Sequence, residues 1–253
     1  MIDFSTLQGL TIPEGVVTQI ADASGRVLWA LKSGTKAVLQ VEKITSKTYA
    51  GGTTYNNEQF ILLDIYPTTN GTVTVTYGGL TKTITDTSGA AEPNAQQVFF
   101  GTLYGVSDSV TTPASGELTI EGDYAGYGIG GVIENSKNLS AYKPCITAIV
   151  EFGEPEFIPS CAFNGCSKVG NVIIPDSVKS IGDYAFFLGD GNSRTVTLLS
   201  NTPPIIVMTT TNTYCYTFRN PGTHNIIVPK GCGNAYKTAQ YWSEFADYIV
   251  EAS

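Results

Sequence analysis

The chain has 253 residues, a net charge of −8 and only 14 lysines and arginines. Nucleic acids and anionic membranes attract proteins mainly through basic side chains, so this charge balance argues against both partners. A hydrophobic fraction of 42% with 14% charged residues predicts a folded globular protein, neither disordered nor a coiled coil. No stretch reaches the roughly 18 apolar residues that span a bilayer, so we expect no membrane insertion.

Residues 1–33 are predicted to form a hairpin that serves as an attachment segment. Apolar runs at 16–20 and 26–29 flank a turn at 22–25, and the glycine in that turn allows a positive φ. Two short strands are marginally stable alone, so we expect the hairpin to dock on a neighbour. The first residues have neither the basic segment nor the apolar core of a signal peptide, so none is predicted.

Residues 34–128 are predicted to form a β-sandwich of immunoglobulin-like type. Short strands are expected at 37–41, 60–66, 72–77, 80–84, 97–100 and 116–120, because most of these segments alternate apolar with polar residues. Asn70-Gly71 and Gly78-Gly79 are typical hairpin-turn dipeptides. Short strands at this spacing are typical of sandwiches, although the Cys-Trp-Cys pattern of antibody domains is absent. We interpret the glycine-rich stretch 126–131 as a flexible linker, since its spacing does not match a dinucleotide-binding fingerprint.

An internal repeat begins near residue 145. The segment from Ile158 to Phe163, with the sequence IPSCAF, recurs as IGDYAF from Ile181 to Phe186, and 186 − 163 gives a period of 23 residues. Apolar residues at fixed offsets, with a period in the twenties, are the mark of a leucine-rich-repeat solenoid. Each coil of such a solenoid buries its apolar face against the next coil.

The repeat resembles the BspA-like leucine-rich repeats of bacterial surface proteins. The matching motifs of the repeats lie at 162–166, 172–182 and 185–186. The closing segment matches at 202–204, 226–229, 235–237 and Trp242. The resemblance covers about residues 145–250. It implies that residues 129–253 form a short solenoid of a protein displayed at the cell surface, which contacts a protein or a host surface.

The third coil departs from the pattern. It has extra residues at 189–193 and 208–214 and lacks the Ala-Phe word, so we expect about two clear repeats with irregular ends. Ala235, Ala239, Trp242, Phe245, Ala246 and Ile249 fall at helical spacing within 234–250. This spacing predicts a C-terminal helical cap for the solenoid. The expected fold class is therefore mainly β (α+β), with a hairpin, a sandwich, a solenoid and a helical cap.

The sequence contains no convincing catalytic, cofactor or metal constellation. His224 is the only histidine, and we interpret it as a loop or cap residue before a strand rather than as a catalytic base. Glu151, Glu154 and Glu156 are close in sequence, and paired carboxylates can cleave glycosidic bonds. We interpret these three as a solvated acidic edge, so an enzyme acting on carbohydrate is the least favoured hypothesis. The five cysteines form no CxxC pair, and their pairing stays open.

A candidate binding surface follows from the alternation of side chains along strands. If Val172 and Ile174 face the core, Ile173 faces solvent. The matching outward positions in the other coils are Val150, Thr197 and Ile227. Such an exposed, mostly aliphatic row is typical of a contact surface. The alternatives are that a loop covers the row or that the register is off by one.

These observations predict a non-enzymatic binding or adhesion module without cofactor or metal, which binds a protein or host-surface ligand through the solenoid sheet. It would lie outside the cell, at the cell surface or on a virion. The alternative is a structural component of a virion or cell wall, with the solenoid as a spacer. The first thirty residues are similar to the start of proteins from gut bacteria and their phages, which keeps a virion origin open. The ligand, the oligomeric state and the export route stay open.

Overall fold

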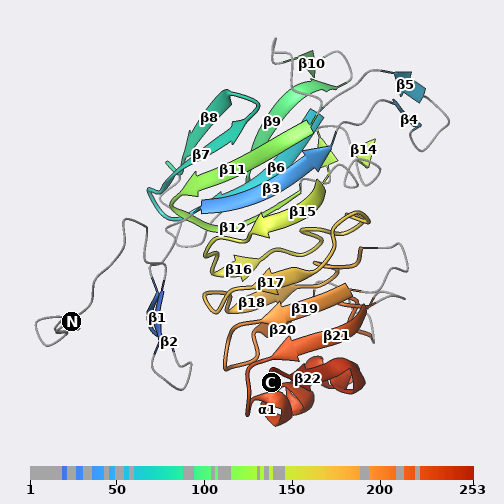
Figure 1. Ribbon diagram of the computed structural model, residues 1–253. Helices are drawn as coiled ribbons and strands as arrows, with labels where there is room; N and C mark the ends of the chain where they lie inside the picture. Colours follow the sequence, from blue (N-terminus) through green and yellow to red (C-terminus); the bar gives the residue numbers. More distant parts are fainter. Residues whose placement is uncertain are drawn as a thin grey trace, which may run out of the picture.

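The computed structural model of the chain is mainly β, which confirms the predicted class (Figure 1). It describes residues 19–21, 27–30, 36–42, 46–48, 54–56, 60–87, 94–103, 106–107, 115–129, 132–133, 137–138, 146–188, 194–208, 214–219 and 223–253. Strands β1 (Gln19–Ala21) and β2 (Val27–Ala30) pair antiparallel, so the N-terminal hairpin is confirmed. Its docking onto a neighbour stays a prediction. Two further pairs are β4 (Ser46–Thr48) with β5 (Thr54–Asn56) and β13 (Val132–Ile133) with β14 (Lys137–Asn138).

Residues 36–129, which we call the antiparallel unit, contribute strands to two antiparallel sheets. One sheet has the order β10-β9-β6-β12 and the other the order β15-β3-β11-β7-β8. The strands are β3 (Lys36–Glu42), β6 (Phe60–Pro67), β7 (Thr72–Tyr77), β8 (Leu80–Thr85), β9 (Gln96–Leu103), β10 (Val106–Ser107), β11 (Ser115–Gly122), β12 (Tyr124–Ile129) and β15 (Ile146–Glu151). Each of the six strands expected between 37 and 120 is therefore confirmed.

The two sheets pack against each other through buried apolar side chains, among them those of β7 and β9. Strand β7 buries Val73, Val75 and Tyr77 and turns its threonines outward, as alternation requires. The ring of Tyr77 contacts that of Phe100 on the opposite sheet, with centroids 6.1 Å apart. The core between the sheets is therefore built from inward positions that the sequence pattern had indicated.

The two predicted turns have different outcomes. Gly78 and Gly79 both have positive φ and join β7 to β8 in an antiparallel pair, so this hairpin is confirmed. Asn70 also has a positive φ, of 60°, but β6 and β7 belong to different sheets. The hairpin prediction at Asn70-Gly71 is wrong, because turn chemistry specifies a chain reversal without specifying which strands will pair.

Residues 146–253, which we call the parallel unit, build two parallel sheets. The first contains β16 (Phe157–Ile158), β18 (Ser180–Gly182) and β20 (Ile205–Val207), and the second contains β17 (Val172–Ile174), β19 (Arg194–Leu198), β21 (Thr223–Val228) and β22 (Ile249–Glu251). Ile158 pairs with Ile181, so the period of the sequence repeat is also the chain distance between these neighbouring strands. Figure 1 shows the successive strands stacked below β15.

A column of stacked aromatic rings fills the core of the parallel unit. Phe163 stacks on Phe186 with centroids 5.5 Å apart, Phe186 stacks on Phe218 at 5.6 Å, and Trp242 closes the column 5.3 Å from Phe218. The segment expected to form the third repeat has no Ala-Phe motif, but Thr217-Phe218 takes its place in the column. This pair lies more than one period beyond Phe186 because the third coil is longer. The inserted residues hide the match from a search at fixed period.

The C-terminal end also differs from the prediction. A short helix α1 (Gly233–Thr238) is followed by the 3-10 helix η3 (Trp242–Tyr248) and then by β22, instead of one helix over 234–250. Tyr241 has a φ of 65°, which ends any continuous helix. Trp242, Phe245 and Ile249 are buried as their spacing predicts. Ile249 is buried as part of a strand and not of a helix, because β22 pairs with β21.

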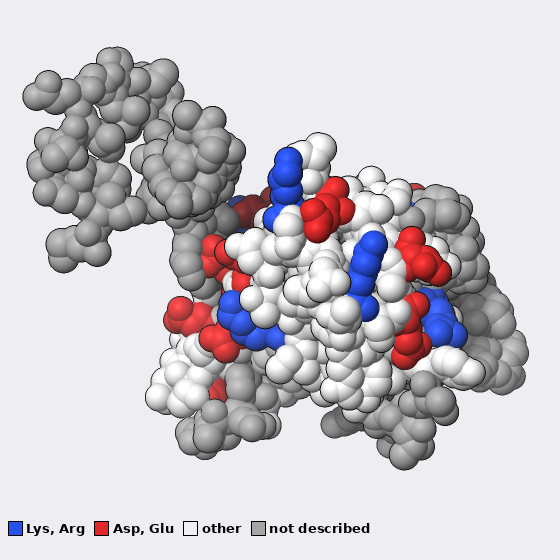
Figure 2. Space-filling view, turned by 90° about the horizontal axis from the view of Figure 1, so that it is seen from below, with Lys and Arg blue, Asp and Glu red and all other residues white. Residues whose placement is uncertain are grey.

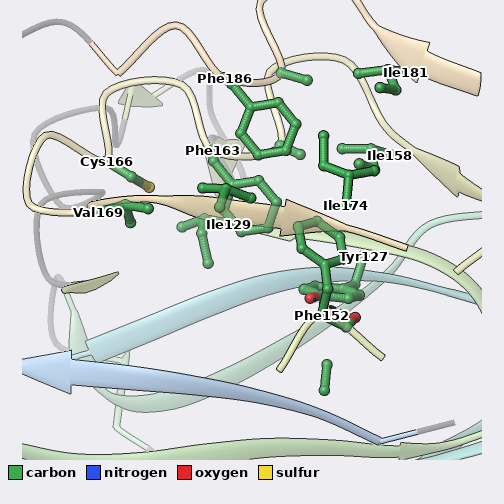
Figure 3. Close-up of a cluster of buried hydrophobic side chains, with 14 of the residues drawn as sticks. Tyr127, Ile129, Phe152, Ile158, Phe163, Cys166, Val169, Ile174, Ile181 and Phe186 are labelled. Carbon is green, nitrogen blue, oxygen red and sulfur yellow. Dashed lines mark hydrogen bonds between the residues drawn. The ribbon is translucent and has the colours of Figure 1, made fainter. Parts of the chain in front are cut away.

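The two units share one core at their junction (Figure 3). Strand β15 opens the parallel unit but pairs with β3 of the antiparallel unit. Strand β12 lies against the first coil: a Cβ on Gly128 would lie 2.9 Å from the Cα of Ala162, and a Cβ on Gly126 would lie 2.8 Å from the Phe157 ring. The flexible-linker interpretation is wrong for 126–129, since these residues form a fully buried strand. Residues 130–131 lie outside the described part.

Polar contacts reinforce this junction. Tyr127 donates a hydrogen bond from its hydroxyl to the carbonyl of Phe152, 3.0 Å away, and Lys168 pairs with Glu42 of β3. The amide of Ile129 donates to the carbonyl of Ala162 at 2.8 Å. The predicted domain boundary after residue 128 stays a prediction, and β12 runs across that position.

Candidate functional site

The predicted surface row divides between two sheets. Ile173 pairs with Thr197, Thr197 with Ile227, and Ile227 with Val250. These four residues, which we call the outer row, cross the sheet of β17, β19, β21 and β22. Val150 lies on β15, which hydrogen-bonds to β3 instead, so it is not part of the row. Val250 is the member that sequence reasoning missed, because it was assigned to a helix.

Burial alternates along these strands as the register requires. Val172 and Ile174 are buried on either side of Ile173, which is 60% exposed. Thr197 and Ile227 are half-buried, and Val250 is 43% exposed. Val150 is also 60% exposed. The predicted register of Ile173 is therefore the observed one, and among the described residues the outer row is accessible.

The described outward side chains next to the outer row are polar and uncharged, apart from the exposed Glu251 beside Val250. Thr195 and Asn225 form the adjacent outward pair, and the amide of Thr195 donates to Oδ1 of Asn171 at 2.9 Å. Arg194 is buried, and its guanidinium donates to the carbonyls of Val169 and Ser167. Within the described residues of these four strands, no charged side chain joins the outer row.

In the part of the chain whose side chains the structure describes, exposed large apolar side chains occur in the parallel unit. Among the described residues, the exposed large hydrophobic side chains are Val150, Ile173, Leu199, Ile205, Val207, Tyr214, Tyr248 and Val250. All of them lie at or beyond β15. Scattered exposed hydrophobic residues are ordinary, whereas exposed residues on paired neighbouring strands, such as those of the outer row, are typical of a contact surface.

A second cluster lies on the loops that follow β18 and β20. The rings of Tyr184 and Tyr216 stack with centroids 4.8 Å apart, and the guanidinium of Arg219 lies 5.5 Å from the Tyr216 ring and 4.8 Å from that of Tyr214. Arg219 also donates to Glu244 of η3 at 3.0 Å, and the Glu244 carboxylate accepts from the amide of Cys215. This stack joins the enlarged third coil to the C-terminal end, so we assign it a structural role.

The C-terminal end is closed by a carboxylate clamp. The Glu251 oxygens accept hydrogen bonds from the amides of Gly231 and Gly233, each at 2.8 Å. These backbone hydrogen bonds, that of Gly231 first, lower the pKa of Glu251. Figure 2 shows this end of the molecule, where acidic and basic side chains are interspersed without a large area of one sign.

The remaining candidate residues lie on β21, on β15 and in the segment that follows β15. His224 lies within β21 rather than in a loop before it, and its side chain lies outside the described part. Glu151 ends β15, Glu154 follows in a loop, and Glu156 donates its amide to the carbonyl of Ala125 at 2.7 Å. Their interpretation as an acidic edge stays a prediction.

The part of the chain that the structure describes contains neither a group of metal ligands nor a helix that could span a membrane. There, no three histidine, cysteine or acidic residues are grouped to hold a metal ion. No described helix has the length and apolar character needed to cross a membrane. Cys215 and Cys232 are free thiols, Cys161 lies at the surface and Cys166 in the core, and Cys145 lies outside the described residues.

Comparison with known proteins does not assign a family. No family model matches the chain, and no curated protein matches it.

Proposed function

We propose that the chain is a non-enzymatic binding or adhesion module, displayed outside the cell or on a virion, which contacts a protein or host-surface ligand through the outer row. In this proposal residues 129–253 are a short BspA-like leucine-rich-repeat solenoid, and residues 34–128 are an immunoglobulin-like sandwich. The observation that carries the function is the exposed, uncharged outer row on a parallel sheet.

The solenoid assignment is supported by the spacing of the strands and of the aromatic column. Strands β16 and β18 pair at the repeat distance, as β21 and β22 do, and phenylalanines stack along the unit. Repeat proteins place such sheets on an extended surface that serves for binding. Ile173 and Val250 of that sheet are exposed in the described part of the chain, which supports an external partner.

The test is a binding screen of the intact protein against arrays of host glycans and extracellular matrix proteins. We expect a specific hit that Ile173→Asp abolishes, because a carboxylate at a dry apolar contact is left without a partner. The matched control is Val207→Asp, which places the same charge at an exposed aliphatic position on the other parallel sheet. Equal hits for wild type and Ile173→Asp would contradict the proposal.

A structural role is the second candidate, and the junction favours it. The shared core and the close approach of β12 to the first coil would make the two units a stiff spacer for a virion or cell wall. This role predicts a homo-oligomer in solution. If the protein sediments strictly as a monomer at high concentration, this result would argue against the structural role.

A further inference from the structure

We infer that the ligand of the outer row is an uncharged apolar patch on another protein, recognised over a small area and without ionic contacts. This inference rests on the proposed function and adds the chemistry of the partner. It starts from the composition of the surface: among the described side chains of the four strands, the outward ones include Ile173, Thr195, Thr197, Asn225, Ile227 and Val250.

Charge selects the class of partner. The whole chain carries a net charge of −8, yet the members of the outer row and the described outward side chains of Thr195 and Asn225 are uncharged. The carboxylate of Glu251, which is exposed and follows Val250 in β22, already accepts hydrogen bonds from the amides of Gly231 and Gly233. A charged partner group would lose its hydration on this surface and gain no counter-charge, which is strongly unfavourable. A partner without charge avoids that cost.

Area limits the strength of the contact. Four strands about 4.8 Å apart, with outward rows about 7 Å apart, present a surface of roughly 300–400 Å². A stable protein–protein interface buries about 800 Å² on each partner. A second copy of this chain seated on the same surface would fall short of that area and would also bring two acidic chains together. The outer row therefore fits a transient contact, strengthened when several copies are displayed together.

The exposed fractions indicate a projecting surface rather than a pocket. Ile173 at 60% and Val250 at 43% stand out from the sheet, whereas sites for small molecules enclose most of their ligand. The apolar side chains would bury themselves against a partner of similar chemistry, and the hydrophobic effect would supply the affinity.

The experiment measures the salt dependence of array binding and the oligomeric state together. The intact protein, Ile173→Asp and the Val207→Asp control are applied to arrayed extracellular matrix proteins at 50 and 500 mM NaCl. We expect a hit that is lost in Ile173→Asp, kept in Val207→Asp, and changed less than about twofold by salt, because screening acts on charges only.

Each other outcome has a distinct meaning. A hit lost in Ile173→Asp that also weakens more than about tenfold with salt would overturn this inference and leave the proposed function standing. A blank array, or a hit unaffected by Ile173→Asp, would overturn both. If sedimentation shows that the wild type is a dimer and that the Ile173→Asp variant is a monomer, the outer row binds a second copy of the chain and the inference is wrong.

Discussion

The antiparallel and parallel units obey the same alternation of side chains but place different chemistry on their outer faces. On the β7–β8 hairpin the outward residues are threonines, whose hydroxyls pair across the strands in Thr72–Thr85, Thr74–Thr83 and Thr76–Thr81. On the sheet of β17, β19, β21 and β22 the corresponding positions include Ile173, Ile227 and Val250. In both units the inward side chains form the core. The two units therefore differ in their outward side chains, and the aliphatic ones of the parallel unit suit it to contact with a partner.

The edge of the antiparallel sheet sharpens this contrast. Strand β8 is the last strand of its sheet, and its Lys82 points inward to the carbonyl of Phe99 and over the Phe100 ring. Inward lysines on edge strands discourage pairing with other chains. Threonines cover the outer face of this hairpin, and Lys82 discourages β8 from pairing with another chain. The parallel unit instead leaves aliphatic side chains exposed.

The largest expected effect tests whether the two units unfold together. Phe186→Ala removes the middle ring of the aromatic column and should lower the free energy of unfolding by about 3–5 kcal/mol. Phe100→Ala makes the matching change in the antiparallel unit. Because one core spans both units, each variant should show a single transition in denaturant, followed by circular dichroism. Two separated transitions would mean that the units are independent.

The second-largest effect is expected at the junction between the two units. Gly128→Ala would place a Cβ 2.9 Å from the Cα of Ala162, so we expect a loss of about 1–3 kcal/mol from overpacking. Gly170→Ala is the control, because a Cβ there meets nothing within 4 Å. Thermal melts of both variants would show the difference. Equal stability of the two would mean that β12 does not press on the first coil.

A smaller effect is expected from ion pairs in the two units. Arg219→Ala removes a contact with Glu244 and two ring contacts, so the loss should be about 1 kcal/mol. Lys36→Ala breaks the more exposed pair with Glu121, whose atoms are 3.4 Å apart, and should cost a few tenths of a kcal/mol at most. Urea titration compares them. A Lys36 variant as unstable as the Arg219 variant would contradict the assigned role of the ring stack.

The smallest expected effect is a pH dependence at the C-terminal clamp. The pKa of Glu251 is lower in the folded chain, so its stabilising contribution is present above the ordinary carboxyl pKa and is lost as the pH falls below it. Glu251→Gln should therefore melt with a weaker dependence on pH below about pH 4.5 than wild type does. Melting temperatures from pH 7 to pH 3 measure this. Identical slopes would show that the clamp does not respond to protonation.

The sequence alone determined the strands and the period of the repeat. Alternation located β3, β6, β7, β8, β9 and β11, since a half-buried strand must place apolar residues on one face. The period of the repeat anticipated the pairing of Ile158 with Ile181. Alternation also assigned Ile173 to the outward face, because the neighbours of an outward residue on a strand must point inward.

The tertiary structure decided the features that depend on contacts between distant residues. Phe218 joins the aromatic column although it lies more than one period beyond Phe186, because stacking requires a position in space and not a fixed spacing along the chain. Gly128 reads as a linker residue in the sequence, but its missing side chain allows β12 to approach Ala162. Val250 enters the outer row because β22 pairs with β21, whereas the local pattern favoured a helix. Local patterns specify which face of a segment is buried, but its neighbours in space determine what it packs against.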